Sequence, residues 1–104
     1  MSAVVVTAAF HPIEGGRESL TAALEQSLAA VHAEDGCELY ALHDAEDGTL
    51  VLIEKWSSRD ALAAHAAGDA VVRLNAAVAP FLVRPTTVTA MTALPAGDAR
   101  RGAI

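Results

Sequence analysis

Few side chains in this sequence of 104 residues could take part in chemistry, and they lie far apart along the chain. There are four histidines, one tryptophan, one tyrosine and one cysteine. Histidine exchanges a proton near neutral pH, so His65 is a candidate general base. The histidines are too dispersed for a recognisable metal motif, and we expect no metal. The single Cys37 allows neither an intramolecular disulfide nor a cysteine-based zinc site.

The other reactive side chains each allow two interpretations. Tyr40 and His43 are three residues apart, so a regular strand places them on opposite sides and at most one faces a pocket. Trp56 could stack on an aromatic ligand or simply fill the core. His65 could serve a pocket or bond a backbone group or a neighbouring carboxylate. Glu54 is two residues before Trp56 and so points to the same face of the strand. At a strand end, however, it is expected to be an exposed carboxylate.

Composition and charge exclude several classes of function. The net charge is −6, and the chain has one lysine and six arginines, four of them scattered and two, Arg100 and Arg101, in the expected tail. Binding to nucleic acid or to an anionic membrane needs a basic stripe, which is not visible. No apolar run approaches membrane-spanning length, and the first ten residues do not resemble a secretory leader. These features lead us to expect a soluble cytoplasmic protein.

The hydrophobic pattern predicts a single α+β domain. Strands are expected at 3–10, 37–43, 50–56 and 86–94, with helices from about 20 to 34, from 59 to Gly68, and from a capping Asp69 towards Pro80. This order is βαββαβ, the ferredoxin-like arrangement, with a four-stranded antiparallel sheet and the helices on one face. The domain should span 1–94, and 95–104 should form a tail that is loose or contacts a partner subunit.

Apolar residues on both faces of the predicted strands indicate self-association. In the segments 4–6 and 50–53 successive residues are apolar, although helices can cover only one side of the sheet. A bare second face would expose several hundred Å² of apolar surface, which monomers seldom tolerate. We therefore expect a homodimer in which two sheets stack face to face as a dimeric α+β barrel.

Two short motifs resemble a known family. The segment 54–65, Glu-Lys-Trp-Ser-Ser-Arg-Asp-Ala-Leu-Ala-Ala-His, resembles a family pattern of Glu-x-Trp followed by a serine or acidic cap and Ala-His. The segment 34–37, Glu-Asp-Gly-Cys, resembles the Glu-x-Gly-Cys that closes the first helix in that family. Over residues 3 to 94 the chain resembles the antibiotic biosynthesis monooxygenase (ABM) domain family of the dimeric α+β barrel superfamily.

The resemblance implies a cofactor-independent oxygenase that oxidises a small phenolic, anthrone-type or hydroquinone substrate with O2. The substrate would lie between the helices and the sheet of each subunit. An electron-rich phenolate can itself reduce oxygen, so the protein need only desolvate it, orient it and help to deprotonate it. No cofactor is then expected.

The resemblance also assigns roles to particular residues. Trp56 matches a pocket tryptophan, and His65 matches the histidine of Ala-His. Anthrone-type relatives carry a histidine near position 43, which favours His43 over Tyr40 as a second catalytic residue. Leu52 stands where those relatives have an asparagine that assists oxygenation. Asn75 stands where haem-degrading relatives have the iron-binding histidine, which argues against haem degradation.

The expected site therefore has two parts. His65 and His43 are the catalytic candidates, and the substrate-binding candidates are Trp56, Leu52, Tyr40 and Asn75. Two alternatives stay open at this point. One is a non-catalytic dimer that binds a small hydrophobic ligand, and the other is a cofactor-free isomerase or cyclase of the same superfamily, because the fold does not choose between them.

Overall fold

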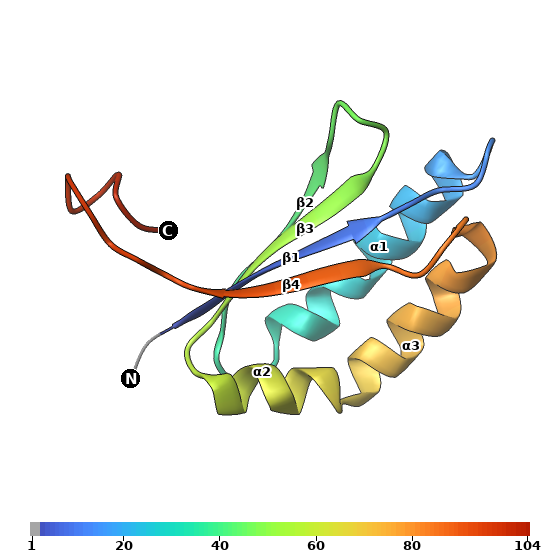
Figure 1. Ribbon diagram of the computed structural model, residues 1–104. Helices are drawn as coiled ribbons and strands as arrows, with labels where there is room; N and C mark the ends of the chain where they lie inside the picture. Colours follow the sequence, from blue (N-terminus) through green and yellow to red (C-terminus); the bar gives the residue numbers. More distant parts are fainter. Residues whose placement is uncertain (1–2) are drawn as a thin grey trace.

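The computed structural model describes residues 3–104 and has the expected ferredoxin-like α+β architecture (Figure 1). The elements in chain order are β1 (Val4–Phe10), α1 (Arg17–His32), β2 (Cys37–Asp44), β3 (Leu50–Trp56), α2 (Arg59–Ala66), α3 (Asp69–Val78), a 3-10 turn (Ala79–Phe81) and β4 (Thr87–Thr92). The strands form one antiparallel sheet in the order β2-β3-β1-β4. The predicted element order and fold class are confirmed, with the last strand shorter than expected.

The helices lie on one side of the sheet, and the core fills the space between the two layers (Figure 1). Every second residue of β1 and of β3 is buried against the helices, because successive side chains of a strand point to opposite faces. Leu20, Leu24 and Val31 cover this face from α1. Leu74 and Val78 cover it from α3.

The break between α2 and α3 allows one connection to bend over the sheet. Ser58 caps α2 by accepting a hydrogen bond from the backbone N–H of Ala61, as its residue type suggests. Gly68 separates the two helices, as expected. It also takes the N-cap position of α3, so Asp69 is the first helical residue and not the cap that we predicted.

None of the helices in the described part of the chain lies on the opposite face of the sheet. The strand register places Val5, Thr7 and Ala9 on it, beside Val51 and Ile53 of the neighbouring strand. We call this surface the open face. Its apolar side chains are only partly buried within one chain, whereas their neighbours on the helix side are fully buried.

The segment after β4 leaves the domain (Figure 1). It folds into a local turn in which the Asp98 carboxylate accepts hydrogen bonds from the backbone N–H groups of Arg100 and Arg101. Contact of this tail with a partner stays a prediction. Within residues 3–104 no helix is both long and apolar enough to cross a membrane.

Gly36 joins α1 to β2 at a close contact with the start of α2, which leads to a first prediction. Its φ is +81°, and an added Cβ would lie 2.5 Å from Cβ of Ala61 and 2.7 Å from Oγ of Ser57. Gly48 has a similar φ of +95° but open space around it. The left-handed backbone costs a non-glycine residue about 1–2 kcal/mol. Overpacking adds about 1–3 kcal/mol.

We therefore expect Gly48→Ala to lower the free energy of unfolding by about 1–2 kcal/mol and Gly36→Ala to lower it clearly more. Urea denaturation of both variants would measure the difference. Equal losses would show that Gly36 is needed only for its backbone conformation and not for the close approach of α2.

Candidate functional site

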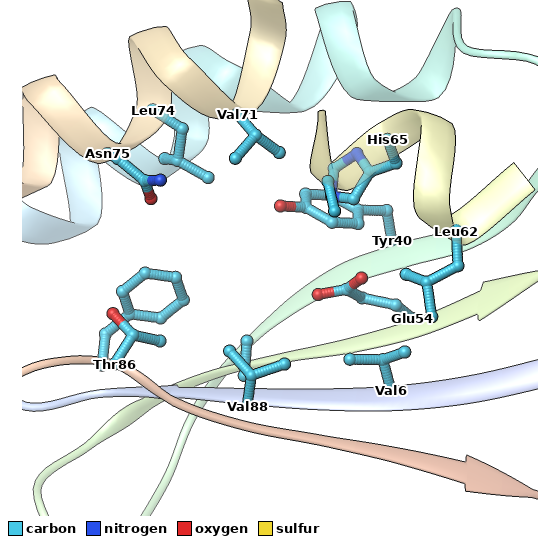
Figure 2. Close-up of a pocket in the computed structure, with 13 residues that line it drawn as sticks. Val6, Tyr40, Glu54, Leu62, His65, Val71, Leu74, Asn75, Thr86 and Val88 are labelled. Carbon is cyan, nitrogen blue, oxygen red and sulfur yellow. The ribbon is translucent and has the colours of Figure 1, made fainter. Parts of the chain in front are cut away.

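A pocket of about 210 Å³ lies between the helix face of the sheet and the helices α2 and α3 (Figure 2). Its lining is largely apolar, with polar side chains at a few points. The lining residues are Val6, Ala8, Phe10, Tyr40, Glu54, Leu62, His65, Ala66, Val71, Leu74, Asn75, Thr86 and Val88. An apolar cavity with a small number of polar groups is typical of sites for small organic ligands.

Glu54 and Tyr40 reach the pocket from neighbouring strands. They are direct partners in the register of β2 and β3, so their side chains lie next to each other. Figure 2 shows the Tyr40 hydroxyl and the Glu54 carboxyl group both directed into the pocket. Glu54 is only 4% exposed. The expectation of an exposed carboxylate at this position is therefore wrong, because the alternation of β3 turns the side chain beneath the helices.

Burial changes the acidity of both groups. Loss of solvation raises the pKa of Glu54, although a hydrogen bond from Trp56 and the nearby charge of His65 act in the opposite direction. Loss of solvation also raises the pKa of Tyr40, and the negative charges of Glu54 and Glu34 add to the effect. The site thus favours the neutral forms of the Glu54 carboxyl group and of the Tyr40 phenol.

His65 enters the pocket from α2 and is held by a carboxylate behind it. Its Nδ1 lies 2.6 Å from Oε1 of Glu34, at the end of the connection from α1. A carboxylate can only accept, so Nδ1–H is the donor and the neutral imidazole keeps a free lone pair on Nε2. No residue within 3–104 forms a hydrogen bond with Nε2, and this atom is not among the fully buried polar atoms. It therefore keeps some contact with solvent, in a side chain that lines the pocket.

An aromatic cluster fixes the rings around this histidine. The Trp56 indole stacks on the His65 imidazole with ring centroids 4.4 Å apart and an interplanar angle of 29°. Tyr40 packs edge-on against both rings. The indole Nε1–H donates to Oε1 of Glu54 at 3.0 Å. Trp56 is 0% exposed and is not among the lining residues, so it supports the site from the core, while stacking on a ligand stays a prediction.

The structure brings together only part of the predicted site. His65, Tyr40 and Asn75 line the pocket, whereas Leu52 is buried in the core beside it. His43 is exposed and bonds the carbonyl of Ala41 on the open face.

The register of β2 and β3 is regular from Leu39 to Asp44, so Tyr40 and His43 do point to opposite sides as their spacing indicated. The preference for His43 over Tyr40 is thereby reversed.

Sequence reasoning missed three polar residues of the site. Glu54 could have been found from its parity with Leu52 and Trp56, which places it on the buried face of β3. Glu34 is 31 positions away from His65, and no local pattern announces that contact. Thr86 lies before the last strand, where only the register of β4 on β1 places it at the pocket.

The arrangement can move a proton at one end of an apolar cavity. It presents an oriented imidazole, a carboxyl group of raised pKa and a phenol, all next to space for a flat ring. Within the described part of the chain, no three histidine, cysteine, aspartate or glutamate side chains are grouped so as to hold a metal ion.

The chain is similar to known proteins over most of its length. Residues 3–77 match the family described as "Antibiotic biosynthesis monooxygenase". A Mycobacterium tuberculosis protein named "Putative monooxygenase Rv0793" is 38% identical over 94 residues, which are 89% of this chain and 93% of that protein.

Solved structures show the same fold. The structure of Rv0793 superposes with a TM-score of 0.84 at 37% identity, covering 93% of this chain and all of that one. Protein SO0527 of Shewanella oneidensis gives a TM-score of 0.79 at 26% identity, covering 88% of this chain and 90% of its own. With the fold and the sequence in agreement, this chain belongs to the antibiotic biosynthesis monooxygenase (ABM) family.

Proposed function

We propose that this protein is a cofactor-independent monooxygenase that oxidises a small phenolic, anthrone-type or hydroquinone substrate with O2 in the pocket described above. The observation that carries the proposal is the grouping of His65, Glu54 and Tyr40 at one end of an otherwise apolar cavity. Membership of the ABM family, in which a relative is named as a monooxygenase, supports the same reading.

The first step of the proposed reaction is removal of a phenolic proton. His65 is the base, because its side chain lines the pocket, Glu34 holds the proton on Nδ1, and no residue within 3–104 bonds Nε2. A positioned base of this kind contributes roughly 10²–10⁴ in rate. The apolar walls strip water from the substrate anion, which strengthens its tendency to give an electron to oxygen.

The second step forms the carbon–oxygen bond. The phenolate transfers one electron to O2, and the resulting superoxide combines with the substrate radical at a ring carbon that bears hydrogen. The peroxide takes up a proton, and loss of water then breaks the O–O bond and removes that hydrogen. One oxygen atom ends in a quinone carbonyl and the other in water, so a phenol and O2 give a quinone and H2O.

Glu54 is proposed to handle the second proton. It lies on the same face of β3 as Leu52, two residues further along, and so provides a polar group near the position where related oxygenases carry an asparagine. Its raised pKa suits a carboxyl group that holds a proton and delivers it to the peroxide. The missing asparagine also suggests the alternative of a non-catalytic ligand binder, which the oxygen-uptake experiment below separates from an oxygenase.

We also propose that the protein forms a homodimer through the open face. This surface is apolar at Val5, Val51 and Ile53, and no element formed by residues 3–104 covers it. Stacking it on a second copy would remove its apolar side chains from water.

Replacement of His65 tests the proposed base. We expect His65→Gln to lower the rate of oxygen uptake with hydroquinone and anthrone substrates by about 10²-fold or more. The rate is measured with an oxygen electrode after subtraction of spontaneous oxidation. His43→Gln is the matched control, since this histidine lies on the other face of the sheet, and its rate should stay within about twofold.

Failure of the wild-type protein to exceed the spontaneous rate would remove the oxygenase proposal. In that case a rise in the midpoint of thermal unfolding with the same compounds would favour the non-catalytic binder.

The buried carboxyl group of Glu54 predicts a characteristic pH dependence of stability. Its native pKa is raised, whereas the unfolded chain has an ordinary value of about 4.3. Wild type therefore has its full stability below the unfolded pKa and loses stability as the pH rises through the native pKa. Glu54→Gln keeps a carbonyl to accept from Trp56 but does not ionise, so this loss should be absent.

Urea denaturation of wild type and Glu54→Gln between pH 4 and pH 8 measures the effect. The variant should become the more stable of the two towards the upper end of that range. A difference in stability that does not change with pH would contradict the burial of this carboxyl group.

A charged substitution tests the proposed dimer. Ile53 lies on an inner strand of the open face, between Thr7 of β1 and Ala41 of β2. We expect Ile53→Lys to convert the dimer to a monomer in sedimentation experiments, because a lysine would be desolvated in the stacked interface. Val72→Lys, at an exposed position of α3, should leave the dimer intact. A wild-type protein that sediments as a monomer in dilute solution would contradict the proposal.

A further inference from the structure

The polar groups of the pocket are divided between its two ends. Figure 2 shows Tyr40, His65 and Glu54 at one end, Asn75 and Thr86 at the other, and Val71 with Val88 between them. The first group contains the base of the proposed reaction. The second group has no role in that reaction, although it faces the same cavity.

Asn75 and Thr86 are available to a ligand. Asn75 lies four residues after Val71 and next to Leu74 on α3, and it is the only polar residue that this helix contributes to the pocket. Thr86 lies just before β4, and Figure 2 shows Thr86 and the Asn75 amide on the two sides of this end of the cavity. Neither side chain forms a hydrogen bond with another residue within 3–104.

The strand register sets the separation of the two ends. Glu54 is level with Val6 on β1, whereas Thr86 comes just before Thr87, the partner of Ala9, and is therefore level with Phe10. Glu54 and Thr86 are also two strands apart in the sheet. Strand geometry then gives a Cα separation on the order of 16 Å. After allowance for the side chains and for a hydrogen bond at each end, the remaining span fits one or two aromatic rings.

The volume of the cavity indicates a ligand of the same size. An apolar cavity of about 150 Å³ accepts benzene. The pocket here has about 210 Å³, enough for one or two rings, whereas a three-ring anthrone would need the walls to move.

We infer that Asn75 and Thr86 form a second polar anchor, and that the pocket selects a one- or two-ring aromatic compound with a hydroxyl or carbonyl group at each of two opposite ends. One hydroxyl lies at His65 and Glu54, and the far oxygen bonds the Asn75 amide and the Thr86 hydroxyl. The inference rests on the proposed function in taking an aromatic substrate. It adds the residues that determine specificity and narrows the substrate class.

Binding of a matched pair of ligands tests the anchor without oxygen chemistry. The probes are 2,6-dihydroxynaphthalene, with a hydroxyl at each end, and 2-naphthol, which lacks the second hydroxyl. Isothermal titration under nitrogen gives the dissociation constant of each. We expect wild type to bind the diol about 5–10-fold more tightly, the effect of one or two neutral hydrogen bonds.

The variants Asn75→Ala and Thr86→Val should each reduce this preference, and the double variant should abolish it while leaving the affinity for 2-naphthol within about twofold. Thr89→Val is the matched control, because it makes the same chemical change on the opposite face of β4. Its preference for the diol should equal that of wild type. If the double variant does not fold, Asn75→Ala alone decides, since this residue is exposed on α3.

A wild-type protein without preference for the diol would overturn the inference, and so would a preference that survives in the variants. The oxygenase proposal is tested separately by oxygen uptake. A diol preference that the variants lose would support the anchor even if no oxygen were consumed. Oxygen uptake with phenols but without that preference would leave the oxygenase in place and reject the anchor.

Discussion

The pocket depends on one constraint, the two-residue alternation of β3. Because Leu52 and Trp56 must face the core, Glu54 between them has to face it as well. A carboxyl group in an apolar layer costs free energy unless it is hydrogen-bonded. Among residues 3–104 no lysine or arginine pairs with it, and the bond from Trp56 is its only hydrogen bond. This cost is the reason to regard Glu54 as functional, since an apolar residue would serve the core better.

The surrounding rings follow from that burial. The Trp56 indole uses its single N–H on Glu54, so its ring plane is fixed, and the plane of His65 stacked on it is fixed too. Glu34 then determines which imidazole nitrogen carries the proton. A hydrogen bond from Nε2 of His32 to the backbone carbonyl of Tyr40 also joins α1 to β2 next to the cluster. The proposed base is thus oriented by side chains from three separate segments, which a flexible loop could not achieve.

The sequence predicted the elements better than the contacts between them. The apolar run at 50–56, the serine cap before residue 59 and the break at Gly68 are local signals, and the strands and helices appear there with small shifts. The position of Glu54 was also within reach, because parity alone gives the face of a strand.

The pairing of Glu34 with His65 was not within reach, since it depends on how α1 ends beside α2. The positions of Trp56 and His43 relative to the cavity were out of reach for a related reason. Whether a side chain lines a cavity or lies beneath it depends on how the helices pack on the sheet, which the pattern of a single strand does not show.

The two faces of the sheet have different surroundings in the folded chain. The lining residues lie on the helix face of the sheet or in the segments above it, whereas the proposed dimer uses the open face. The stacked sheets would then lie on the other side of Glu54 and Tyr40 from the pocket. Because both residues belong to the strands that would carry the interface, a weakened dimer should reach the reaction through the stability of this sheet.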